Sequence, residues 1–148
     1  MATFIGEYSA RIDDRGRLVF PASFKACIPA NASGKLVVKK SIYDECLEIY
    51  TFEEWEEQSA KLKDSLNFFN PKHVQFYREY MRDRDVVQPD PKFGRITIAK
   101  TLLDSIGVDK NVVFFGTDFK IELWAKEKFE ASRISHEEYV SIAESLSK

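Results

Sequence analysis

Basic side chains cluster around two glycines of this chain, in a pattern suited to binding phosphate. Arg15 and Arg17 flank Gly16, and Arg95 directly follows Gly94. A guanidinium group holds its N–H donors in a planar fork, which fits both a phosphate group and the edge of a guanine base. A glycine before the arginine predicts a tight turn that presents the side chain from a rigid base. The spacing therefore indicates contacts with nucleic acid.

The first of these turns predicts a row of charged side chains. Arg11, Asp13, Arg15 and Arg17 share the same parity, so in an extended arm they would project to one side. A salt bridge from Arg17 to Asp13 that braces the turn is the alternative, and both possibilities stay open. We expect Arg11 and Arg15 to contact DNA, because no acidic partner stands at hairpin spacing from either residue.

The second turn leaves the same two possibilities open for Arg95, which is close in sequence to Asp90. Lys25 has no acidic partner at hairpin spacing and is also expected to contact DNA. The candidate DNA-binding residues are thus Arg11, Arg15, Arg17, Lys25 and Arg95, with Asp13, Gly16 and Gly94 as the structural residues of the turns.

The composition is typical of one globular domain. The chain has 148 residues, of which 44% are hydrophobic and 31% charged, and its net charge is −2. The basic residues gather near 11–25 and 78–95, which predicts a small basic face on an acidic body. The longest aliphatic-aromatic stretch is Val112–Phe115, and Glu7 interrupts any signal-peptide core. We therefore expect a cytoplasmic protein with no membrane partner.

Motifs for catalysis are missing from the sequence. It contains no P-loop, no paired-glycine nucleotide fingerprint and no nucleophile elbow. Its only histidines, His73 and His136, stand near predicted helix starts. Cys27 and Cys46 are far apart without a neighbouring histidine or cysteine, which predicts two reduced, packed thiols and no zinc site. We expect no enzyme, no cofactor, no metal and no small-molecule substrate.

The chain contains an internal repeat. Gly16-Arg17-Leu18 recurs as Gly94-Arg95-Ile96 at an offset of 78 residues, and Leu47–Tyr50 recurs as Ile121–Trp124 at an offset of 74. The second copy is therefore four residues shorter between these points. A module this small buries too little surface to be stable alone, so two copies are expected to pack on each other.

Both copies predict the same order of elements: a strand, a short helix and two further strands. These are residues 18–20, 22–28, 36–40 and 47–50 in the first copy, and residues 96–98, 100–106, 111–115 and 121–124 in the second. The expected division is a first module at 4–55, a helical insert at 56–84, a second module at 85–130 and a C-terminal helix at 131–148.

Three helix starts outside the repeat have clear capping signals. Thr51 and Ser135 each stand three residues before a glutamate, and Asn70 precedes a proline. The helix after Ser135 has an apolar face formed by Tyr139, Ile142, Ala143 and Leu146. We expect it to pack on its own chain, with a neighbouring chain as the alternative. The aromatics Phe68, Phe69, Tyr77 and Tyr80 are likewise expected in the core.

Longer segments resemble one protein family. They are Gly6-Glu7-Tyr8, Asp13-x-x-Gly16-Arg17-Leu18-x-x-Pro21-Ala22, Cys46–Tyr50 with Glu54-Trp55, Gly94-Arg95-Ile96-x-Ile98 and Ile121–Trp124. Together these residues strongly resemble MraZ proteins, which are duplicated relatives of the AbrB/SpoVT swapped-hairpin regulators. The resemblance covers residues 4–129.

The resemblance implies an α+β fold with two tandem AbrB/SpoVT-like swapped-hairpin β modules joined by helices. It also implies a bacterial transcription regulator that binds short DNA repeats upstream of its own division and cell-wall gene cluster. Such a protein is cytoplasmic and nucleoid-associated, and it forms a ring-shaped homo-oligomer. Because one turn reaches only a few phosphates, we expect that several linked turns are needed for useful affinity.

The family's D-x-x-x-R motif falls on Asp13 and Arg17 in the first copy. In the second copy Arg95 is present, but Pro91 occupies the aspartate position and Asp90 is displaced by one. We therefore expect the first copy to supply most DNA contacts and the second mainly to support oligomer packing. The competing hypothesis is a protein-interaction module that assembles without binding DNA.

Overall fold

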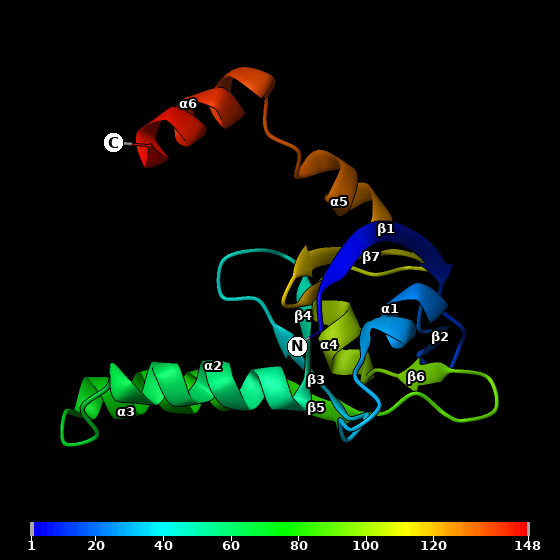
Figure 1. Ribbon diagram of the computed structural model, residues 1–148, viewed down its shortest axis with the longest axis horizontal. Helices are drawn as coiled ribbons and strands as arrows, with labels where there is room; N and C mark the ends of the chain where they lie inside the picture. The colour runs from blue at the N-terminus through cyan, green and yellow to red at the C-terminus, as the bar shows by residue number, and fades with distance from the viewer. Residues whose placement is uncertain (1, 148) are drawn as a thin grey trace.

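A computed structural model describes residues 2–147 of the chain (Figure 1). In chain order the elements are β1 (Phe4–Arg11), β2 (Arg17–Val19), α1 (Ala22–Cys27), β3 (Leu36–Lys40), β4 (Leu47–Thr51), α2 (Phe52–Asp64), α3 (Pro71–Met81), β5 (Arg84–Val87), β6 (Arg95–Thr97), α4 (Lys100–Ser105), β7 (Asn111–Asp118), β8 (Ile121–Ala125), α5 (Lys126–Ala131) and α6 (His136–Leu146). The repeated strands and helices of both copies thus form as the sequence predicts. Strands β1 and β5 and helix α5 are not predicted by the sequence pattern.

The strands form a six-stranded antiparallel sheet and a separate two-stranded ribbon. The order in the sheet is β1-β7-β8-β4-β3-β5, and the ribbon pairs β2 with β6. The first strand of each copy leaves its own module: β1 pairs with β7 of the second copy, and β5 pairs with β3 of the first. This exchange confirms the α+β fold with two tandem swapped-hairpin modules. The proposed domain boundaries stay a prediction.

The two copies are related by an approximate two-fold axis. In the ribbon, Leu18 lies directly opposite Ile96, its equivalent in the other copy. In the sheet, Glu48 lies directly opposite Glu122, again its equivalent. Because both central pairs join equivalent positions, the axis passes through the ribbon and through the middle of the sheet.

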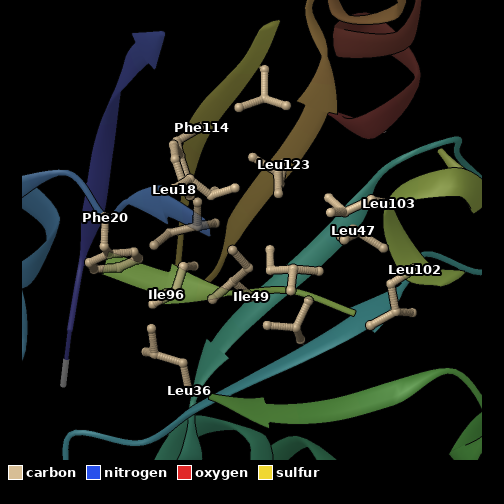
Figure 2. Packing of buried hydrophobic residues seen from close by; sticks show 14 of the residues in the cluster. Leu18, Phe20, Leu36, Leu47, Ile49, Ile96, Leu102, Leu103, Phe114 and Leu123 are labelled. Atoms are coloured by element: carbon tan, nitrogen blue, oxygen red, sulfur yellow. The ribbon is translucent and has the colours of Figure 1, made fainter. Parts of the chain in front are cut away.

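The hydrophobic core lies between the sheet and the layer formed by the ribbon, α1 and α4 (Figure 2). Leu18 and Ile96 point into it from the ribbon, while the residues that alternate with them face outward. Phe24 of α1 holds the N-terminal strand in place through edge-on contacts with Phe4 and Tyr8, at ring separations of 5.5 and 4.9 Å. The core therefore fixes the ribbon to the sheet.

The opposite face of the sheet contains a buried ion-pair cluster. The Glu48 carboxylate accepts hydrogen bonds from Lys39 Nζ at 2.9 Å, Lys120 Nζ at 2.7 Å and the Tyr50 hydroxyl at 3.2 Å. Burial alone would raise the pKa of Glu48, but the hydrogen bonds from the two lysines outweigh it and hold the pKa below 4.5. Burial raises the pKa of the nearby Cys46 thiol to about 12.

The predicted helix starts are confirmed by their caps. Thr51 Oγ1 accepts the Glu54 N–H at 3.1 Å, and Asn70 Oδ1 accepts the Lys72 N–H at 3.0 Å. The Ser135 hydroxyl in turn accepts a backbone N–H at the start of α6. These bonds form within four residues of the cap, so the local sequence is enough to specify them.

Three expectations about burial are wrong. Every residue from 131 to 147 is exposed, so α6 does not pack on its own chain. Phe69 at the tip of the α2–α3 hairpin is 99% exposed and Phe68 is 48% exposed. Tyr77 and Tyr80 are half-buried, and Tyr80 packs against Lys39 and Arg84. Cys27 is exposed, and only Cys46 is buried. In each case the residue type favours burial, but the fold places no apolar surface of the chain over it.

Candidate nucleic-acid interface

The outer face of the β2–β6 ribbon brings the two Gly-Arg segments together. Arg17 pairs in register with Thr97, and Arg95 pairs with Val19. All four side chains alternate with the buried Leu18–Ile96 pair and therefore share the outer face. Arg17 and Arg95 are diagonal neighbours in this register, and the backbones of such neighbours are about 7–8 Å apart. One surface thus presents an arginine from each copy.

The first turn is built around the Asp13 carboxylate. Its Oδ1 accepts the backbone N–H groups of Arg15 and Arg17, each at 2.9 Å, and its Oδ2 accepts Nε of Arg17 at 2.6 Å. The backbone reverses here, because the Gly16 N–H donates to the Asp13 carbonyl. Gly16 adopts φ +75°, and a Cβ there would lie 2.6 Å from the carbonyl oxygen of Ile98. Only glycine fits this position.

The second turn repeats this arrangement with one additional residue. Asp90 Oδ1 accepts the N–H groups of Lys92 and Phe93, and Oδ2 accepts the Arg95 N–H at 2.9 Å. The Arg95 Nε lies 3.6 Å from the same oxygen. Asp90 therefore binds the backbone N–H groups of its turn as Asp13 does in the first turn. The assignment of Pro91 to the aspartate position is wrong. An ungapped match misplaced the aspartate because the second turn is longer by one residue.

Each turn is anchored to the other copy. The Gly16 carbonyl accepts the Ile98 N–H at 3.0 Å, and the Gly94 carbonyl accepts the Phe20 N–H at 2.9 Å. These bonds are equivalent under the two-fold axis. These bonds between the two copies fix both turns in position relative to the ribbon.

Both aspartates remain ionised at neutral pH. A backbone hydrogen bond from Arg17 is the main cause that lowers the pKa of Asp13, and one from Phe93 lowers the pKa of Asp90. A carboxylate that accepts several N–H bonds favours its charged form. Each turn thus contains a fixed negative group that orients its arginine.

The arginines keep hydrogen-bonding capacity beyond these salt bridges. The side chains of Arg17 and Arg95 are each 33% exposed. Arg17 uses only Nε toward Asp13, and Nε of Arg95 lies 3.6 Å from Asp90 without a hydrogen bond. Within residues 2–147, the terminal amino groups of both have no hydrogen-bond partner. The two possibilities left open by the sequence are therefore compatible: the aspartate orients a guanidinium whose outer donors stay available.

The remaining predicted residues lie on different surfaces. Arg11 and Arg15 line one groove of about 620 Å³, whereas Arg17 and Arg95 line another of about 600 Å³. Lys25 is exposed on α1 and lines neither groove. The expected extended arm with all side chains on one side is wrong, because the turn at Asp13 to Gly16 separates Arg11 from Arg17.

The structure adds basic residues that sequence reasoning missed. Lys100 and Lys110 from the second copy line the groove of Arg11 and Arg15. Lys92 joins the other groove, where its Nζ lies 5.1 Å from the ring of Phe93. Lys92 could have been predicted because it stands two residues before Gly94. Lys100 and Lys110 are far from the first turn in sequence, and the strand exchange between the two copies brings them next to it.

The two turns differ at their tips. Phe93 occupies the position of Arg15, and it is 55% exposed with the Arg95 guanidinium 4.6 Å from its ring centre. Among residues 2–147, one turn therefore presents a cation without an ion-pair partner, and the other presents an aromatic ring with a cation stacked on it. The scaffold is symmetric, but the chemistry that it presents is not.

Two further classes of site are not found in the described part of the chain. No helix within residues 2–147 is long and apolar enough to cross a membrane. Over the same residues, no group of three or more His, Cys, Asp or Glu side chains is arranged to hold a metal ion.

These features define a class of protein. Two interlocked β modules, each holding an arginine turn braced by an aspartate on one exposed ribbon, make this chain a tandem swapped-hairpin protein. A family model described as "MraZ protein, putative antitoxin-like" matches residues 3–79 and 82–144. The chain belongs to the MraZ family.

Curated relatives match over almost the whole chain. A Bacteroides thetaiotaomicron protein is 35% identical over 99% of this chain and 93% of its own length. A Bacteroides fragilis protein is 35% identical over 88% of this chain and 82% of its own. A Phocaeicola vulgatus protein is 32% identical over 92% and 88%, respectively. All three are named transcriptional regulator MraZ, so the chain is similar to transcriptional regulators rather than to enzymes.

Proposed function

We propose that this chain is a transcription regulator that binds double-stranded DNA sequence-specifically through its two arginine turns. The observation that carries the proposal is the joint placement of Arg17 and Arg95 on one ribbon, each oriented by an aspartate and each with free outer donors. Preorganised guanidinium groups lose little freedom on binding and fit phosphates and guanine edges. The names of the relatives support the same reading.

The proposed contacts divide into two kinds. Arg15 at the tip of the first turn reaches base edges, and Arg17 and Arg95 bind the backbone on either side of the two-fold axis. Arg11 and Lys25 are exposed and make further phosphate contacts. The first copy thus supplies most DNA contacts, and the second contributes Arg95 and helps to hold the assembly.

Assembly provides the remaining affinity. A chain of net charge −2 that reaches a few phosphates binds DNA weakly, because each neutralised phosphate adds only about 0.9 to the salt slope. Linking several chains in a ring makes later contacts intramolecular, which raises avidity by roughly 10²–10⁴ where the spacing of the DNA sites fits. The proposed target is accordingly a set of short repeats.

The proposed location of these repeats is the promoter of the chain's own division and cell-wall gene cluster. The resemblance to MraZ proteins supports this location, and the repeated geometry of the binding surface suits repeated DNA sites. The protein would then act in the cytoplasm, associated with the nucleoid, as a regulator without catalytic activity.

The experiment is a fluorescence-anisotropy titration with duplex DNA from upstream of the chain's own operon. A shuffled duplex of equal length and composition is the control, and salt is varied from about 50 to 200 mM. We expect at least tenfold tighter binding to the native duplex and a linear fall of log K with log salt. Equal affinity for both duplexes would remove sequence specificity. A stable oligomer that retains no DNA at the lowest salt would favour the interaction-module hypothesis.

A further inference from the structure

Helix α6 is amphipathic but covers nothing in its own chain. All of its residues are exposed, and Tyr139, Ile142 and Leu146 are exposed by 65%, 51% and 79%. An isolated helix of eleven residues is marginal in water, so a partner surface is needed to stabilise it. The hydrogen bond that caps the helix at Ser135 indicates that this segment is helical in the assembled protein.

The apolar residues of α6 form one stripe. Tyr139, Ile142, Ala143 and Leu146 are spaced i, i+3, i+4 and i+7, which places them on one face of the helix. This spacing is typical of a helix that lies in a hydrophobic groove. Glu138 borders the stripe, because its position is about 100° from the stripe's centre on a helix of 3.6 residues per turn.

The α2–α3 hairpin has a groove with the matching pattern. The groove measures about 300 Å³ and is lined by Phe68, Phe69, Pro71, Val74, Gln75 and Arg78. The last four also have the spacing i, i+3, i+4 and i+7, so they form one face of α3. Phe68 is 48% exposed and Phe69 99% exposed. An exposed apolar surface with polar residues at its rim is typical of a site that binds a partner.

The two surfaces carry opposite charge. Of the three glutamates of α6, Glu138 borders the stripe and the other two lie on the opposite face of the helix. Lys72 and Arg78 of α3 form no salt bridge among the described residues. The only acidic residue on α3, Glu79, is engaged by Arg82 at 3.4 Å. Docking would therefore bring Glu138 close to an unpaired arginine on an otherwise apolar contact.

We propose that α6 of one chain docks into the α2–α3 groove of a second copy of this chain. Within one chain α6 and the hairpin leave the body as separate arms (Figure 1), so the occupant of the groove comes from another molecule. The contact joins different surfaces and is therefore heterologous, which closes into a ring when the rotation allows. This inference rests on the ring oligomer of the proposed function and assigns its interface.

The first test uses single substitutions in the DNA-free protein. Ile142→Asp places a charge within the apolar stripe, and Ser141→Asp adds the same charge on the opposite side of α6. Arg78→Glu reverses the charge in the groove, and Lys63→Glu makes the same change on exposed α2. Light scattering should show that Ile142→Asp and Arg78→Glu fall to the mass of one chain. The two controls should keep the mass of the unaltered protein, and circular dichroism should show that all four variants fold.

Mixing the two defective variants gives a sharper test. In a heterologous contact, α6 of the Arg78→Glu chain is intact and so is the groove of the Ile142→Asp chain. Equimolar mixing should therefore form a heterodimer with one good contact and no larger species. A contact between identical patches would give no such complementation.

The outcomes separate this inference from the proposed function. Full-size assemblies of Ile142→Asp or Arg78→Glu would overturn the α6–groove interface and leave the ring hypothesis standing. A single-chain mass for the unaltered protein would overturn both the interface and the ring. DNA binding is decided independently, by the anisotropy titration.

Discussion

The Nε of Arg17 donates to Oδ2 of Asp13 at 2.6 Å, within a turn whose backbone N–H groups bind the other carboxylate oxygen. One carboxylate therefore shapes the turn and aims the guanidinium at the same time. Across the two-fold axis, Asp90 likewise shapes its turn through backbone N–H groups, and its Oδ2 lies 3.6 Å from Nε of Arg95, as an ion pair without a hydrogen bond. DNA binding by this chain should consequently depend on acidic residues that never touch DNA.

The first prediction concerns Asp13. In Asp13→Asn the amide oxygen still accepts the backbone bonds of the turn, but the nitrogen in place of Oδ2 no longer accepts Nε of Arg17. We expect DNA affinity to fall about tenfold, although a negative charge is removed from the surface. Asp14→Asn, an exposed neighbour in the same turn, is the control and should bind at least as well as the unaltered protein. Equal affinity of both variants would contradict an orienting role.

The second prediction concerns the salt dependence of DNA binding. Removing one phosphate contact should reduce the slope of log K against log salt by about one. Arg95→Ala should reduce this slope by a similar amount on the native and the shuffled duplex. Arg15→Ala should reduce the slope and also the preference for the native duplex. Lys61→Ala on α2 is the control and should change neither quantity. An unchanged slope for Arg15→Ala would remove that residue from the interface.

The third prediction compares the two turn glycines. Gly16→Ala and Gly94→Ala both place a side chain at positive φ, which costs about 1–2 kcal/mol of unfolding free energy. At Gly16 the new Cβ also meets the Ile98 carbonyl at 2.6 Å, whereas at Gly94 nothing lies within 4 Å. Urea unfolding should therefore show a greater loss for Gly16→Ala, by at least about 1 kcal/mol. Similar losses would mean that the backbone around Gly16 and the Ile98 carbonyl can move apart at little cost.

The fourth prediction concerns acid stability. The folded-state pKa of Glu48 lies below its ordinary 4.5, so its ion pairs stabilise the fold fully above that pH. This contribution is lost as the pH falls through the lower, folded-state value. Glu48→Gln should lower the free energy of unfolding at pH 7 by about 3–5 kcal/mol, because Lys39 stays buried without its partner.

The pH dependence of the same variant provides a second readout. Between pH 5 and 3, urea unfolding of Glu48→Gln should depend less on pH than that of the unaltered protein. Glu122→Gln, at the equivalent position across the axis, is the control. Its carboxylate lies 3.9 Å from Lys120 and is not the main partner of a buried lysine, so its substitution should have a smaller effect. An equal loss from both variants would contradict the central place of Glu48.

Local features of the fold were predictable because they depend on neighbours in sequence. The caps at Thr51, Asn70 and Ser135 each form within four residues, and the glycines at 16 and 94 adopt the positive φ that their turns require. The two copies were visible because equivalent positions keep equivalent residue types. The position of Asp90 was misjudged because a one-residue insertion is invisible without the turn's hydrogen bonds.

The sequence by itself determined two copies of one small module, their turns and the arginines that follow each glycine. Only the tertiary structure decided that β1 and β5 cross to the other copy, that Arg17 and Arg95 share one face, and that α6 is left uncovered. The physical reason is that strand pairing and burial join residues far apart in the chain. A strand's alternation specifies which of its faces is apolar, but the partner that covers that face is chosen by the whole fold.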